Sequence, residues 1–170
     1  MLTGLGVLAM IYLAGNLPGS AFLIRLKLTE RLFGEAVFLP DPIREEGRSS
    51  QDLNGNYTKF QLYHLEAEKM KQIEAAIAKN PNFPDEDKPS TWQKITWHRL
   101  VTPQDAKAFH PILTLANDWA GSFHLQQRIE KNLQAGKHIY LSGFYKKPTD
   151  IELYLVFPEQ KELIQIDIDT

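Results

Sequence analysis

Histidines are the side chains of this sequence best suited to acid–base or metal chemistry, and there are five of them in 170 residues. A zinc helix needs two histidines four residues apart, and no pair has that spacing. His110 and His124 flank a predicted helix that carries Asp118. These three side chains are therefore the candidates for a small hydrolase or transferase.

Other catalytic patterns are missing from the sequence. There is no cysteine, which excludes disulfides, thiolate nucleophiles and cysteine-based zinc sites. No GxSxG motif and no phosphate-binding loop with its lysine occurs. Asp167 and Asp169 are interpreted as solvated charges on the polar face of the last strand. We therefore predict no catalytic residues, no metal ligands and no cofactor, and favour a protein that is not an enzyme.

Aromatic residues near the C-terminus suggest binding instead. Tyr140, Phe144 and Tyr154 fall opposite the apolar register of their predicted strands, beside Lys146 and Lys147. An exposed aromatic face with lysines is typical of a contact surface, so we predict that it binds a protein partner. The formal net charge of -2 argues against nucleic acid as the partner.

The strands that would carry this face can be predicted from the last third of the chain. Residues 138–145, 150–157 and 162–168 alternate as three strands, and the short turns between them predict an antiparallel meander. Helices are predicted over residues 62–79, from Thr102, and over residues 122–136; residues 91–101 read as a further strand. The sequence therefore predicts a small α+β domain over residues 57–170, with helices packed on a three-stranded C-terminal meander.

Residues 1–24 contain no charged side chain. As a helix they would be ~36 Å long, enough to cross a bilayer core. A membrane anchor is favoured, and Arg25, Lys27 and Arg31 after it would place the large domain in the cytoplasm. The alternatives are a signal peptide cleaved near Ala21, or a buried segment of a soluble fold followed by a strand over residues 22–28. Residues 25–56 are expected to be a basic flank and polar linker.

One family resemblance rests on the sequences of residues 12–26, "YLAGNLPGSAFLIRL", and residues 39–47, "LPDPIREEG". Together they resemble the start of the bacterial acyl-phosphate-dependent glycerol-3-phosphate acyltransferases. That resemblance implies a first membrane helix followed by a phosphate loop. The family has several further membrane helices, whereas no second apolar stretch follows residue 39 here. The resemblance therefore identifies no family.

These observations favour one function and leave two alternatives. The favoured function is a non-catalytic, membrane-tethered domain that binds a protein partner in an accessory, assembly or immunity role. The first alternative is the hydrolase or transferase using His110, Asp118 and His124. The second is a soluble domain that buries its N-terminal segment in its own core.

Overall fold

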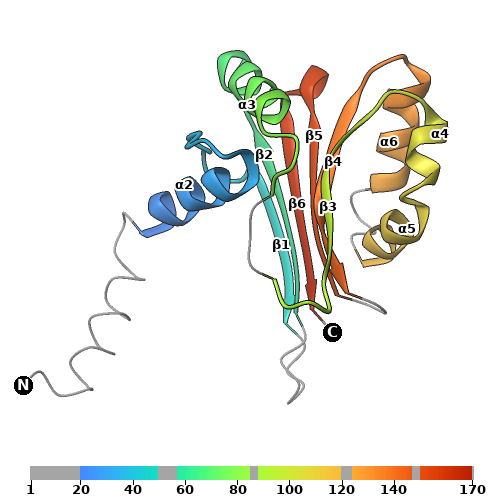
Figure 1. Cartoon of the computed structure of the whole chain (residues 1–170), viewed down its shortest axis with the longest axis horizontal. Coiled ribbons are helices and arrows are strands. Elements are labelled where there is room, and N and C mark those ends of the chain that lie inside the picture. The colour runs from blue at the N-terminus through green and yellow to red at the C-terminus, as the bar shows by residue number, and fades with distance from the viewer. Residues whose placement is uncertain (1–19, 50–56, 85–87, 120–123, 147–149, 170) are drawn as a thin grey trace, which may run out of the picture.

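The computed structural model describes residues 20–49, 57–84, 88–119, 124–146 and 150–169. Within these residues the chain forms one antiparallel β-sheet that has helices on both faces (Figure 1). The strands are β1 (Arg44–Ser49), β2 (Tyr57–His64), β3 (Gln93–Leu100), β4 (Ile139–Lys146), β5 (Asp150–Phe157) and β6 (Glu162–Asp169).

The six strands are ordered β1-β2-β6-β5-β4-β3, and every neighbouring pair is antiparallel. The last strand, β6, lies between β2 and β5, so that Tyr57 pairs with Asp169. The C-terminal strand therefore lies inside the sheet, between a strand from the first half of the chain and the strand that precedes it.

Two helical layers cover the sheet (Figure 1). One face carries α2 (Ser20–Phe33) and α3 (Ala67–Lys79); the other carries α4 (Pro103–Lys107), α5 (His110–Trp119) and α6 (Leu125–Gln134). A short 3-10 helix, η2 (Pro158–Gln160), lies between β5 and β6. Each layer packs on its own apolar cluster: one includes Leu155 and Ile166 and lies under α5 and α6, and the other includes Tyr63 and Val156 and lies under α2 and α3.

Strand β5 is buried along its whole length. Leu153 and Leu155 point to the layer of α5 and α6, whereas Tyr154 and Val156 point to the layer of α2 and α3. All four side chains have no exposed surface. The face that the sequence analysis expected to be open is therefore covered by helices.

The predicted three-stranded meander is wrong, because it is only half of a six-stranded sheet. β4, β5 and β6 are present as predicted, but β3, β2 and β1 extend the sheet on both sides. The sequence does not reveal β2, because the pattern of its last residues also fits the start of the following helix. β1 was hidden because its sequence, REEGRS, has no apolar residue and belongs to the stretch expected to be a linker. It is an edge strand, which pairs only with β2 and needs no buried face.

The predicted single-pass anchor is also not supported. Among the described residues, no helix has both the length and the apolar character that crossing a membrane requires. Residues 1–19, most of the predicted anchor, lie outside the described residues, and the cytoplasmic placement and the cleavage near Ala21 stay predictions. Residues 22–28 belong to helix α2 and not to a strand.

The C-terminal end of α2 is fixed to the sheet by buried contacts. Leu32 and Phe33 have no exposed surface. The ring of Phe33 stacks on Trp97 of β3 with 5.4 Å between ring centroids, and the Trp97 indole donates a hydrogen bond of 2.7 Å to the Leu32 carbonyl. These contacts hold the rest of α2 above the sheet.

Candidate functional site

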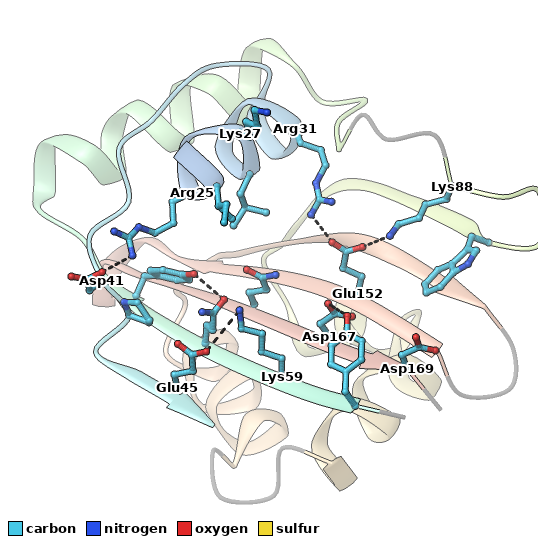
Figure 2. A pocket seen from close by; sticks show the side chains of 18 residues that line it. Arg25, Lys27, Arg31, Asp41, Glu45, Lys59, Lys88, Glu152, Asp167 and Asp169 are labelled. Atoms are coloured by element: carbon cyan, nitrogen blue, oxygen red, sulfur yellow. Dashed lines mark hydrogen bonds and ion pairs between the residues drawn. The ribbon is translucent and has the colours of Figure 1, made fainter. Parts of the chain in front are cut away.

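A groove of about 820 Å³ lies between α2 and the sheet (Figure 2). Its base is formed by side chains of β2, β5 and β6, and residues 41–42 and 88–92 close its sides. We call it the α2 groove. Five basic and five acidic side chains line it: Arg25, Lys27, Arg31, Lys59, Lys88, Asp41, Glu45, Glu152, Asp167 and Asp169.

The groove exists because the strands under α2 change from apolar to polar halfway along. Under α3, Tyr63 and Leu163 are paired across β2 and β6, and both are buried among apolar neighbours. Two and four residues further along, the same face carries the pairs Gln61–Gln165 and Lys59–Asp167. Alternating residues of a strand share one face, so this polar half must lie beside the apolar half. The helices cover the apolar half closely and leave the polar half as the base of the groove.

Glu152 of β5 is the most heavily bonded group in the groove. Its side chain is 6% exposed, and its two oxygens bind Arg31 at 2.5 Å and Lys88 at 2.7 Å. The hydroxyl of Tyr154 donates a further hydrogen bond to it. Burial raises the pKa of this carboxyl, but Arg31, Lys88 and Tyr154 together outweigh burial and hold its pKa below the usual range. Glu152 is therefore an ionised anchor for α2 and for the segment after residue 87.

Asp167 of β6 lies directly opposite Glu152 in the pairing of β5 and β6. Burial raises the pKa of Asp167, and the nearby negative charge of Glu152 raises it further. A hydrogen bond of 2.6 Å from the Tyr57 hydroxyl works in the opposite direction but does not cancel these effects. Asp167 is therefore a carboxylate whose charge is incompletely compensated.

Three acceptor side chains follow each other along β6 on the groove face: Gln165, Asp167 and Asp169. Gln165 is 9% exposed, and its Oε1 atom has no hydrogen-bond partner. Among the described residues, neither Asp167 nor Asp169 forms an ion pair within 4.0 Å. A buried acceptor without a partner is costly, so this row is ready to accept hydrogen bonds from a ligand.

The residues predicted to form a protein-binding face do not form an exposed surface together. Phe144 and Tyr154 are buried, and Tyr140 is half-buried with its ring edge-on to His138. Lys146 forms an ion pair with Asp150 at 3.1 Å, while Lys147 lies outside the described residues. Phe144 and Tyr154 instead border the α2 groove, since Lys88 lies 5.6 Å from the Phe144 ring centre and Tyr154 binds Glu152.

The histidine candidates lie on the other side of the sheet, with the layer of α5 and α6. His110 is exposed and its Nδ1 lies 3.1 Å from the Thr114 hydroxyl. His124 is exposed and precedes α6 in a left-handed conformation. The side chain of Asp118 lies outside what the structure describes. In the described part of the chain, no three histidine or acidic side chains are grouped in a way that would hold a metal ion.

Only part of the groove can be predicted from the sequence. Polar residues alternate along β6, but the sequence predicts that Asp167 and Asp169 are solvated, because it does not show which residues lie beside them. The sequence gives no signal for Glu152, since its ion pair with Arg31 joins residues that are 121 positions apart. The pairing of β2 with β6 brings the rest of the base together, and no local pattern reports it.

Comparisons of this chain with protein-family models, with curated proteins and with solved structures find no match. The site must therefore be interpreted from its own chemistry.

Proposed function

We propose that this chain is a non-catalytic binding domain and that a small polar ligand binds in the α2 groove. The observation that supports this most directly is the Gln165 Oε1 atom, a buried acceptor without a partner in the base of the groove. The volume of about 820 Å³ is within the range of small-molecule sites, roughly 300–1,000 Å³. A ligand that donates a hydrogen bond to Gln165 would remove the cost of leaving this atom unpaired.

The binding role that the sequence favours is kept here, but the binding site is the α2 groove and not the aromatic face. A protein partner was expected on Tyr140, Phe144 and Tyr154, but α2 and α3 cover that face of the sheet. The groove beside it contains buried polar groups instead of exposed aromatic surface, which suits a small polar ligand better than a large apolar partner.

A hydrolase that uses Glu152 and Asp167 is the second candidate. Two carboxyl groups on neighbouring strands have pKa values shifted in opposite directions, which is a common arrangement of a catalytic acid and base. Binding is favoured because both oxygens of Glu152 are already bound to Arg31 and Lys88. A base or nucleophile needs an oxygen that can reach the substrate.

The test is a nuclear magnetic resonance screen of the isotope-labelled full-length chain with small polar compounds: sugars, nucleosides, dicarboxylates, amines and amino acids. We expect at least one compound to shift amide signals of β2, β6 and α2 selectively. Gln165→Leu should abolish these shifts, because it replaces the acceptor with an apolar group of similar size. Gln134→Leu makes the same change in a separate cavity between α4 and α6, and should leave the shifts intact. If every compound leaves the groove signals unmoved, the proposal is wrong.

A further inference from the structure

Most cations of the α2 groove form ion pairs with its own acids (Figure 2). Arg25 binds Asp41 at 2.5 Å through Nη1, while its buried Nε atom has no hydrogen-bond partner. Arg31 and Lys88 share Glu152, and Lys59 lies 3.8 Å from Glu45. Lys27 is exposed on α2. The positive charge that lines the groove is therefore largely used within the protein.

The acids along β6 are not matched in this way. Asp167 and Asp169 form no ion pair with any described residue. The Tyr57 hydroxyl binds one oxygen of Asp167, and the attraction of Lys88 acts on Asp167 only weakly against burial and the charge of Glu152. Negative charge in the groove therefore collects at one place, on the strand next to Glu152.

The third member of this row is an independent indication of what is missing there. Gln165 lines the groove and is 9% exposed, and its buried Oε1 atom has no hydrogen-bond donor. An oxygen of this kind needs an N–H or O–H group. Because the two acidic neighbours on β6 also need positive charge, a group that carries both N–H donors and a positive charge suits each of these side chains.

We infer that the α2 groove binds an organic cation, an ammonium or guanidinium group, through Gln165, Asp167 and Asp169 of β6. This inference rests on the proposed binding function and names the chemistry of the ligand. Successive side chains on one face of a strand are about 6.8 Å apart, so a short diamine can reach two of the acceptors at once. A free amine and a lysine side chain of a peptide carry the same group, and the experiment separates these two sources.

The experiment compares four-carbon compounds of similar length whose end groups are positively charged, neutral or negatively charged. The full-length chain is titrated with putrescine, butanediol and succinate while the amide signals of β2, β6 and α2 are followed. We expect putrescine to shift these signals in a saturable way, and butanediol and succinate to leave them unchanged. N-acetyl-lysine amide is a further arm: saturable binding shows that a peptide lysine can supply the cation, and its absence beside putrescine binding assigns the site to free amines.

Matched variants locate the cation. Asp167→Asn and Asp169→Asn should each weaken putrescine binding by about tenfold, as expected for the loss of a charge-assisted contact. Glu159→Gln removes the same charge from the turn at the other end of the sheet, and should leave the affinity unchanged. Since Asp169 is exposed, its replacement does not endanger the fold.

Three outcomes distinguish a failure of the inferred cation binding from a failure of the proposed binding function. If succinate or butanediol shifts the groove signals and putrescine does not, the groove binds ligands but the cation is wrong. If calcium chloride, titrated in the same way, shifts them and putrescine does not, the cation is a metal ion and the inference is again overturned. If nothing in this set or in the wider screen shifts them, the proposed binding function itself is wrong.

Discussion

Glu152 and Asp167 lie opposite each other on β5 and β6, and their surroundings shift the pKa values of the two carboxyl groups in opposite directions. Glu152 has Arg31 and Lys88 beside it, whereas Asp167 has no ion-pair partner among the described residues. The groove thus combines a carboxylate that stabilises the fold with one that the fold tolerates at a cost. Residues of the second kind are common in binding sites, where stability is given up for function.

The cost of Asp167 predicts a variant that is more stable than the natural protein. Asp167→Asn removes a partly buried charge and keeps an oxygen for the Tyr57 hydroxyl, so its free energy of unfolding at neutral pH should rise. Each kcal/mol of gain raises the melting temperature of a chain of this size by roughly 2–4 °C. Urea denaturation measures the free energy of unfolding, and Asp169→Asn is the control at an exposed position. A less stable Asp167→Asn would show that the charge is already compensated.

The same variant has a defined pH dependence. The folded state raises the pKa of Asp167 above the ordinary 3.8, so the folded state binds the proton more tightly than the unfolded state. This favourable contribution is fully present below 3.8 and is lost as pH rises through the folded-state pKa. The advantage of Asp167→Asn should therefore be largest at neutral pH and shrink in acid. An advantage that grows in acid would contradict the sign of the shift.

Glu152→Gln should have the opposite effect. It leaves Arg31 and Lys88 facing a neutral amide at a buried position, so we expect a loss of about 2 kcal/mol in the free energy of unfolding. Because the folded state lowers the pKa of Glu152, its contribution is present above the ordinary 4.5 and is lost as pH falls through the folded-state pKa. The difference from the natural protein should shrink in acid, and Glu159→Gln, at an exposed position, is the control variant.

The elements that the sequence predicted correctly are those with local signals. β4, β5 and β6 alternate and follow each other closely. The helix predicted from Thr102 is α4, and its start is a complete capping box between Thr102 and Asp105, which local spacing alone reveals. Such signals involve residues a few positions apart, so a single sequence contains them.

The parts that could not be predicted depend on distant residues. The helical spacing of Met70, Ile73 and Ile77 predicts a helix that begins too early, because Tyr63 of β2 fits the helical period as well as the strand period. The role of Tyr154 depends on Arg31, 123 residues away. The contact between Tyr57 and Asp167 spans 110 residues. The site is built from pairings that only the folded sheet defines.

The burial of both faces of β5 predicts that two neighbouring substitutions are equally harmful. Leu155→Asp and Tyr154→Asp each place a charge where no surface is exposed, and each should cost several kcal/mol and unfold the chain. The strand register predicted from the sequence leaves Tyr154 exposed, so it predicts that Leu155→Asp alone is harmful. Tyr140→Asp, at a half-buried position, should cost less. Circular dichroism melts of the three variants check this, and a Tyr154→Asp variant that melts like the natural protein would contradict the α2 and α3 layer.

Gly143 of β4 provides the last prediction, because it controls how closely β4 approaches the groove strand β5. A Cβ atom added at Gly143 would lie 2.1 Å from the carbonyl oxygen of Glu152, far closer than any real contact. Gly143→Ala must therefore push the backbone of β5 away from β4 at the residue that holds Arg31 and Lys88, and we expect a loss of about 3 kcal/mol. Gly47→Ala is the matched control in the edge strand β1, where the nearest atom to the new Cβ is 3.7 Å away, an ordinary contact. Urea denaturation should show a large shift for Gly143→Ala and almost none for Gly47→Ala. Equal midpoints for the two variants would mean that β4 and β5 are not paired as described, and the position of Glu152 in the groove would then fail as well.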